Sequence, residues 1–352
     1  MHIQLVQSMN ENKNVLKYEY EVLKVGDADA ILIRHYINGK PFIVLIDAGN
    51  AGDAAIIKKH LGDYYNSYYI DLAICTHPDS DHKDGFFNLL QDDDIIIETF
   101  WLTDPAQYLD VNDIQRYRSK ENATKAVRKI WQKSTDANLN LIDLALNKCE
   151  KVESVTDGAK HPILPISIVG PSDEYYAEVV KAMVADYGVK TYEDSSKEAY
   201  DNVFKIDEKD IKSIIDNDED LSPYNASSLI ILYEPGDGKR LLFAGDANTT
   251  SLQMMLNKYK RLRNVDLLKV PHHGSRRNLN TSIIEALSPK KCYISAAGNK
   301  KHPSGRLVYW LAKYGGVYST HTCNSYIHCQ SGAMPNRIGC VTLIPLKKKI
   351  IS

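Results

Sequence analysis

Four residues that can bind a metal ion lie close together, directly after an apolar stretch. The apolar stretch, residues 72–75, has the length and composition of a buried strand. The four candidate ligands that follow it are His77, Asp79, Asp81 and His82. A rigid strand can aim such side chains into a cleft, and mixed imidazole and carboxylate ligation suits a divalent cation that activates water. A solvated polar loop is the weaker alternative, because histidines and unpaired acids rarely gather so densely after a core strand.

Other polar residues stand near the ends of further expected strands, in both halves of the chain. They are Asp47, Asp246, the adjacent pair His272 and His273, and His302. Taken alone, such an aspartate is more often a turn or capping residue, and paired histidines are as often structural as functional. Their recurrence at several strand ends favours convergence on one cleft.

Strands are expected in two groups, one toward each end of the chain, with turn signals between them. The expected strands cover residues 18–25, 30–34, 42–46, 72–76, 166–169, 228–233, 240–244, 265–270 and 291–295. The hairpin signals are Asn38-Gly39 and the Pro-Gly-Asp-Gly sequence at 235–238. Because each group of strands is followed by helices, we expect a two-sheet core covered by helices rather than separate domains.

Helices are expected between and after these strands. They cover residues 54–61, a long charged stretch over roughly 111–146, a segment that begins after Ser172, 281–287 and 306–314. Residues 193–220 are rich in Asp and Glu, so we expect this segment to be a surface insertion or a mobile lid.

The composition excludes few functions, but it indicates the kind of protein and the cellular compartment to expect. At 352 residues with 43% apolar content, the chain can bury a sizeable core. A net charge of −2 implies no global attraction to nucleic acid or membranes, although a local basic patch is still allowed. No apolar run is long enough to span a bilayer, and the N-terminal segment lacks the features of a secretion signal. Six cysteines are sparse for this length, so a reduced, cytoplasmic setting is expected.

A second group of potential metal ligands lies near the C-terminal end. Its members are His321, Cys323, His328, Cys329 and Cys340. They could hold a structural zinc ion. However, their spacing fits no standard zinc pattern, and alternating residues on a terminal hairpin explain it equally well.

Several of these segments together resemble the motifs of the metallo-β-lactamase superfamily, in particular the metallohydrolase domain of ComEC-type competence proteins. The segments are residues 25–33, 45–49, 76–82, 225–229 with 244–246, 269–275 and 298–303. The resemblance extends over most of a single domain at 15–350, except for insertions at about 101–160 and 190–222. It implies an α/β fold, a four-layer αββα sandwich with metal ions at one edge of the sheets.

The resemblance also implies a set of ligands. These are His77, Asp79, Asp81, His82, Asp246 and His272, with Asp246 bridging two cations. Either His272 or His273 would complete the second site, and the sequence does not decide between them. Asp47 and Asp29 would orient ligands rather than bind metal.

The chain departs from the superfamily pattern at the first metal site. Asp79 stands where a histidine is usual, and no histidine lies shortly before Asp246. His161 is too far ahead, so Asn225 is the candidate to stand in. One or two divalent ions are expected, and the additional oxygen ligands favour Mn²⁺ or Mg²⁺ over Zn²⁺.

The expected activity is hydrolysis of phosphodiester bonds, including nuclease activity, by a metal-bound hydroxide. Asp81 would orient or deprotonate the water, and His302 or the histidine left free, such as His273, would protonate the leaving oxygen. Arg276 and Arg277 follow the double histidine and suit the phosphate of such a substrate, nucleic acid included. These arginines could equally face solvent or pair with local acids.

Further candidates for substrate contact are Ser275 and Asn225. Two other functions remain open. The same metal chemistry could act on a lactone or thioester, and a degenerate fold could serve only to bind a partner. ComEC proteins are membrane proteins and this chain lacks the membrane part, so DNA uptake is not implied and no protein partner is indicated.

Overall fold

Strands at both ends of the chain form the first sheet. The computed structural model describes residues 17–186, 207–299, 301–337 and 343–346. The first sheet has the order β15-β1-β2-β3-β4-β5-β8. Its strands are β1 (Lys17–Leu23), β2 (Ala30–Ile37), β3 (Lys40–Ala48), β4 (Tyr69–Ile74), β5 (Ile96–Leu102), β8 (Lys151–Ser154) and β15 (Tyr326–Gln330). The pairs from β3 to β8 are parallel, and the other pairs are antiparallel.

The second sheet is built from the C-terminal half and has the order β14-β13-β12-β11-β10-β9. Its strands are β9 (Ile166–Gly170), β10 (Ile230–Tyr233), β11 (Leu241–Phe243), β12 (Leu267–Lys269), β13 (Lys291–Ile294) and β14 (Gly316–Ser319). The pairs from β11 to β14 are parallel. A short hairpin of β6 (Gln132–Lys133) and β7 (Asp136–Asn140) stands apart from both sheets.

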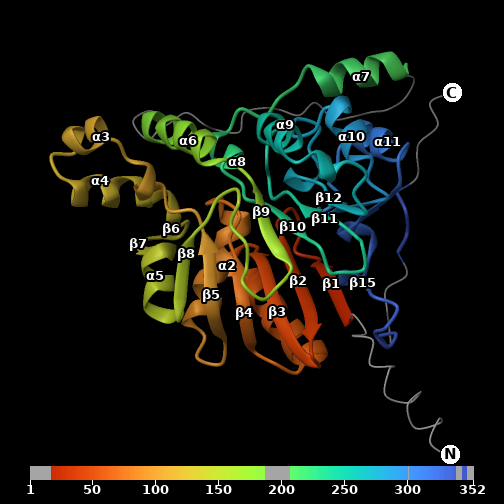
Figure 1. Ribbon diagram of the computed structural model, residues 1–352, viewed down its shortest axis with the longest axis horizontal. Helices are drawn as coiled ribbons and strands as arrows, with labels where there is room; N and C mark the ends of the chain where they lie inside the picture. Colours follow the sequence, from red (N-terminus) through yellow and green to blue (C-terminus); the bar gives the residue numbers. More distant parts are fainter. Residues whose placement is uncertain (1–16, 187–206, 300, 338–342, 347–352) are drawn as a thin grey trace, which may run out of the picture.

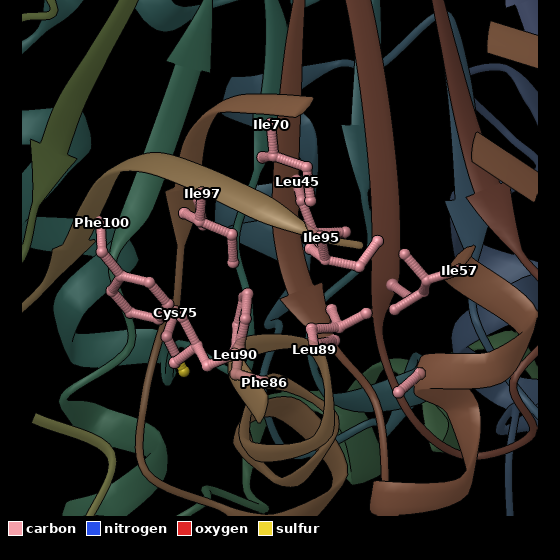
Figure 2. Close-up of a cluster of buried hydrophobic side chains, with 14 of the residues drawn as sticks. Leu45, Ile57, Ile70, Cys75, Phe86, Leu89, Leu90, Ile95, Ile97 and Phe100 are labelled. Carbon is pink, nitrogen blue, oxygen red and sulfur yellow. The ribbon is translucent and has the colours of Figure 1, made fainter. Parts of the chain in front are cut away.

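Alternating side chains of the strands divide the core into layers. In β3, Ile43 and Leu45 pack with residues of the helices, whereas Val44 and Ile46 face the second sheet. Figure 2 shows part of the first of these layers, where Leu45 of β3 lies near Ile70 and Ile95, and Phe86 and Leu89 belong to the same cluster. A third cluster joins the opposite face of the second sheet to its own helices. The core therefore has four layers, and the expected αββα sandwich is confirmed.

Helices cover the outer faces of the two sheets. They are α1 (Ala54–His60), α2 (Ser80–Gln91), α3 (Val111–Arg116), α4 (Lys120–Val127), α5 (Leu141–Lys148), α6 (Asp173–Asp186), α7 (Glu208–Asp216), α8 (Pro223–Ala226), α9 (Thr249–Lys258), α10 (Thr281–Leu287) and α11 (Gly305–Leu311). Residues of α1, α2 and α5 pack on the first sheet, and residues of α7, α9, α10 and α11 pack on the second. Figure 1 shows α9, α10 and α11 grouped on one side of the molecule, and α3, α4 and α6 on the other.

The segment expected to be helical over roughly 111–146 differs from that expectation. It contains α3, α4 and α5, but the β6–β7 hairpin interrupts them. Asp84 in α2 explains this hairpin, because its carboxylate accepts hydrogen bonds from the backbone N–H (3.2 Å) and the hydroxyl of Ser134. The insertion expected at about 101–160 is likewise only partly separate, since β8 extends the first sheet beside β5. Of the expected acidic insertion, residues 190–206 lie outside the described residues.

The parallel strands place the candidate residues at one edge of the sandwich. The carboxyl ends of parallel strands meet at the same edge of a sheet, where loops can hold a ligand. Asp47 lies at the end of β3, the candidate ligands follow β4, β11 and β12, and His302 follows β13.

Candidate metal centre

The ligand loop after β4 turns directly into α2. Asp79 is the residue before the first turn of α2, and Asp81 and His82 lie within that turn. Gly85 lets the helix approach β3 closely, because a Cβ atom there would lie 1.9 Å from the carbonyl oxygen of Ala48. The turn brings Asp81 and His82 to the same site as His77, although an extended chain would separate them.

Four histidine rings converge on one buried carboxylate. The Nε2 atom of His82 lies 3.2 Å from Oδ1 of Asp246. The Nε2 atoms of His77, His272 and His273 each lie 3.9 Å from its Oδ2. Asp246 is the residue that the resemblance assigns as the bridging ligand, and its side chain is 3% exposed.

The other nitrogen of each ring is held by a neighbouring group. Asp47 binds Nδ1 of His82 at 2.8 Å, and the same carboxylate oxygen accepts from the hydroxyl of Thr76. That hydroxyl oxygen lies 3.1 Å from Nδ1 of His77. Asp47 therefore orients two ligands, one directly and one through Thr76.

The double histidine is held in a comparable way. Nδ1 of His272 lies 3.1 Å from the carboxylate of Asp220, and Nδ1 of His273 lies 3.1 Å from the backbone oxygen of Ser295. Both histidines have positive φ angles, 48° and 51°, and are followed by Gly274 at 82°. Positive φ angles raise the conformational energy of residues other than glycine. The turn therefore holds both rings in place although the backbone of the two histidines would favour another conformation.

The cluster fits a divalent cation. Nε2 of His77, Nε2 of His82 and Oδ1 of Asp246 are buried and have no hydrogen-bond partner within the part of the chain that the structure describes. Leaving three buried polar atoms unpaired costs about 1–3 kcal/mol each, and a cation would satisfy all three. Ligand atoms of two overlapping groups lie within 4.8 Å of one another: His77 with His82 and Asp246, and Asp81 with His82 and His273.

The geometry adds His273 to the candidate ligands. Its Nε2 lies 3.0 Å from Asp81, in addition to its approach to Asp246. The carboxylate of Asp79 lies 3.6 Å from Nε2 of His77, at the more exposed side of the cluster. His272 faces the same centre and is held from behind by Asp220.

The charges in the cluster are strongly coupled. Burial would raise the pKa of Asp246, but the charges of His82, His272 and His273 outweigh it and hold that pKa well below its usual value. Burial would lower the pKa of His272, but Asp246 and Asp220 raise it to about 9. Without a cation, protons on the histidines therefore balance the carboxylates, and a divalent ion would compete with those protons.

His302 lies beside the double histidine but has a different charge. Its ring centre is 5.6 Å from that of His272 and 6.0 Å from that of His273. Burial, and then the charges of these two histidines, lower the pKa of His302 to about 3. A ring that is neutral at pH 7 is a poor proton donor, which disfavours the expected role of His302 as the acid.

A buried ion pair supports the cluster from the opposite side. The Lys269 ammonium pairs with Oδ2 of Asp29, and both side chains are almost fully buried. Oδ1 of Asp29 lies 3.8 Å from Nδ1 of His273, and its backbone N–H donates to the carbonyl of Asp81 at 3.2 Å. Asp29 thus lies where the sequence suggested. Lys269 was not singled out, although it precedes the double histidine by three residues.

The residues expected to contact substrate have other partners. Arg276 and Arg277 both pair with Asp218, at 2.9 and 3.1 Å. Ser275 is buried, and its hydroxyl accepts from the backbone N–H of Arg277 at 3.2 Å. Asn225 donates to Asp220 at 2.6 Å. Substrate contact by these four residues stays a prediction.

The C-terminal group of histidines and cysteines does not assemble as a zinc site in the described residues. His328 binds Glu19 at 2.8 Å, and the Cys323 thiol donates to the backbone oxygen of Thr320. Among the residues that the structure describes, no cysteine belongs to a possible metal-binding group. Cys340 lies outside them.

Comparisons with known proteins leave the activity open. No family model matches the chain. One stretch of 92 residues is 33% identical to "ComE operon protein 3" of Bacillus subtilis (strain 168), which is 26% of this chain and only 12% of that protein. No helix among the described residues is long and apolar enough to cross a membrane.

Solved structures with a similar arrangement are distant in sequence. The metallo-beta-lactamase fold protein YhfI from Bacillus subtilis is 11% identical, with a TM-score of 0.45 over 90% of this chain and 100% of that one. Igni18, a metallo hydrolase from the archaeon Ignicoccus hospitalis, is 11% identical, with a TM-score of 0.42 over 88% of this chain and 98% of that one. At these levels of similarity, what the chain does has to be inferred from its own residues.

Proposed function

We propose that the chain is a divalent-metal-dependent hydrolase that acts on phosphodiester bonds. One observation supports this most. Four imidazole Nε2 atoms surround the buried carboxylate of Asp246, and each ring is held through its other nitrogen. Rings held in this way present a lone pair to a cation without further rearrangement, which is the arrangement of a preorganised metal site.

The residues that would hold the ions form two groups around Asp246. His77, His82 and Asp246 would bind one ion, and Asp81 and His273 would bind the other together with a shared carboxylate. His272, whose Nε2 faces the same carboxylate, would be a further ligand. A divalent cation bound there would lower the pKa of a coordinated water and stabilise the charge that develops at the reacting centre.

The proposal gives Asp81 a second role. Its side chain is 28% exposed, whereas that of His82 beside it is fully buried. Asp81 is therefore the carboxylate in this group that substrate and water can reach. Burial would raise its pKa, but the neighbouring His82 and His273 hold the pKa well below its usual value. An ionised, accessible carboxylate can orient the attacking water and accept its proton.

Two features favour a phosphate substrate. Asp79, Asp81 and Asp246 add carboxylate oxygens to the imidazole nitrogens, and such oxygens suit the hard cations that commonly assist phosphoryl transfer. Arg276 also lies just after the double histidine and keeps a buried Nε donor without a hydrogen-bond partner in the described residues. A guanidinium with a spare donor could contact a phosphate oxygen, and nucleic acid is one substrate of this kind.

A carbonyl ester is the second candidate, and one observation favours it. Asp218 already pairs with both arginines, so less positive charge is available to attract an anion than the sequence suggested. The metal-binding groups would serve a lactone or thioester equally well. A fold used only for binding a partner has less support, because it gives no reason to leave buried ligand atoms unpaired.

The test uses the full chain, stripped of metal and reloaded with Mn²⁺. Hydrolysis of bis-(p-nitrophenyl) phosphate and single-stranded DNA is compared with hydrolysis of p-nitrophenyl acetate and a simple lactone, with Asp81→Ala as the control for contaminating enzymes. We expect Mn²⁺-dependent cleavage of the phosphodiesters that Asp81→Ala abolishes. Hydrolysis of the ester or lactone without hydrolysis of the phosphodiesters would favour the alternative that the substrate is a carbonyl ester. No turnover of any substrate in a metal-loaded protein would contradict both.

A further inference from the structure

An acidic segment lies along the double-histidine loop. Residues 217–222, named the acidic strap here, connect the end of α7 to the start of α8. The backbone N–H of Asp220 donates to the carbonyl of Arg277 at 3.0 Å, which fixes the strap against the loop that follows His273. Most of it belongs to the acidic stretch 193–220, for which the composition predicts a surface insertion or a mobile lid.

Arg277 binds the strap through both backbone and side chain. Its Nε lies 3.1 Å from Oδ1 of Asp218, and its NH2 donates to the backbone oxygen of Glu219 at 2.9 Å. Arg276 binds the second oxygen of Asp218 at 2.9 Å. The exposed fractions of the Arg276, Arg277 and Asp218 side chains are 12%, 19% and 32%, so these pairs are partly desolvated. Such charge-assisted pairs are stronger than those on an open surface.

The strap reaches the metal centre through Asp220. A single oxygen of this carboxylate lies 3.1 Å from Nδ1 of His272 and accepts from the amides of Asn225 and Asn278 at 2.6 and 2.9 Å. The Asp220 side chain is 5% exposed. A buried carboxylate with three partners has a fixed position, and it fixes the ring of His272 in turn.

We propose that the acidic strap is a working part of the metal centre. Asp220 is a positioning residue for His272, and the clamp formed by Arg277 and Asp218 holds Asp220 in place. In this arrangement Arg277 acts through the strap and not on the substrate, because the strap already holds its Nε–H and one N–H of its NH2 group, so a phosphate could not take both nitrogens as a fork without breaking a strap contact. The activity readouts below rest on the proposed function, whereas the metal-binding readout does not.

The clamp predicts that removing either partner has the same effect. The variants are Arg277→Met, Asp218→Ala and Asp220→Asn, with Arg277→Lys as the conservative variant. Arg261→Met is the matched control, since it breaks an exposed arginine–glutamate pair with Glu234 on another surface. For each variant, Mn²⁺ affinity is measured by calorimetry, kcat and KM are measured with bis-(p-nitrophenyl) phosphate, and circular dichroism checks the fold.

We expect the first three variants to bind Mn²⁺ about 10–100-fold more weakly, as is usual when the partner of a ligating histidine is lost. Their kcat should fall while KM changes little, and Arg277→Lys should recover part of the loss. Combining Arg277→Met with Asp218→Ala should cost little more than Asp218→Ala alone, because that single change already breaks the clamp, together with the Arg276 pair. Arg261→Met should match the parent protein.

Two results would overturn the proposal. One is unchanged Mn²⁺ affinity and kcat in the clamp variants. The other is opposite effects on KM, raised by Arg277→Met and lowered by Asp218→Ala, which would make Asp218 a competitor of substrate phosphate. A parent protein that bound Mn²⁺ but hydrolysed nothing would remove the proposed function and leave the clamp testable by affinity. A parent protein that bound no divalent metal would overturn both.

Discussion

Two buried clusters of acids and histidines occupy different parts of the molecule, and their difference separates a structural network from a metal site. In the first, on β1 and β15, Glu19 and Glu21 are paired with Arg34 and Arg337, and His328 binds Glu19. We name it the arginine-neutralised cluster. The second is the candidate metal centre around Asp246, where Lys269 pairs with Asp29 and the other acids face histidines, amides, a hydroxyl and a backbone N–H.

The comparison teaches that residue types alone do not define a metal site. Glu19, Glu21 and His328 also lie close enough together to hold an ion. However, two guanidinium groups already supply the positive charge, and the Nε2 atom of His328 is used by Glu19 at 2.8 Å. In the candidate metal centre the Nε2 atoms of His77 and His82 have no hydrogen-bond partner among the described residues, so both stay available to a cation.

The largest expected effect comes from removing a ligand of the metal centre. Asp81→Ala should reduce turnover by more than about a hundredfold, because loss of a ligand exceeds the cost of losing an outer partner. Its partly exposed side chain predicts little change in the midpoint of thermal unfolding. Steady-state kinetics and a melting curve check both points. His82→Ala should abolish activity too but with some loss of stability, since that ring is fully buried. Parent-level turnover in either variant would make the assignment wrong.

The opposite pattern is expected in the arginine-neutralised cluster. Glu19→Gln leaves Arg34, Arg337 and His328 without their shared carboxylate, so the free energy of unfolding should fall by about 3 kcal/mol. Mn²⁺ affinity should stay unchanged, because this cluster makes no contribution to the metal centre. Urea unfolding and calorimetry measure the two quantities. A loss of Mn²⁺ affinity with normal stability would remove the distinction between the clusters.

At acid pH the parent protein and Glu19→Gln should have nearly the same free energy of unfolding. Burial would raise the pKa of Glu19, but the hydrogen bond from His328 and the charges of Arg34 and Arg337 lower it from 4.5 to about 2. A lowered carboxylate pKa stabilises the fold above about 4.5, and this stabilisation is lost as the pH falls toward 2. The difference in unfolding free energy should therefore be full at pH 6 and shrink steadily below pH 4.5. A difference that did not change between pH 6 and pH 3 would contradict the ionic role of Glu19.

The smallest expected effect concerns the choice of metal. Asp79 near His77 makes the first group richer in oxygen, so Mn²⁺ should support several-fold more activity than Zn²⁺ at equal occupancy. Metal analysis before and after reloading sets the occupancy. As a sharper check, Asp79→His should shift the preference toward Zn²⁺. Two tightly bound zinc ions in a fully active preparation would contradict this prediction.

Local patterns in the sequence predicted the two sheets covered by helices, whereas the ligand set came from the family resemblance and stays a prediction. Apolar runs defined the strands, and their parallel pairing brought the loops after β4, β11 and β12 to one edge. Asp220 could not be found in this way, since it reaches His272 across 52 residues and lies in a segment that its composition marks as exposed. The pairing of Arg277 with Asp218, 59 residues apart, also depends on tertiary structure alone.

The hairpin inside the expected helical stretch shows the same limit. Its charged residues suit a helix locally, but the contact between Ser134 and Asp84 depends on the position of α2, 50 residues earlier. Hydrophobic periodicity predicts which face of a helix or strand is buried. It does not predict which polar group from a distant part of the sequence will contact a given side chain.

The pairing of β15 with β1 has a consequence for how the chain is made. Tyr18 and Ser331 are hydrogen-bonded although 313 positions separate them. A ribosome adds roughly 5–20 residues per second, so the open side of β1 waits on the order of tens of seconds for its partner. During that time β1 has an unpaired edge and can join another nascent chain. Pairing of β15 with β1 closes this edge, so newly made protein becomes less prone to aggregate only when β15 has been synthesised. Slow elongation before residue 326 should therefore lower the yield of soluble protein.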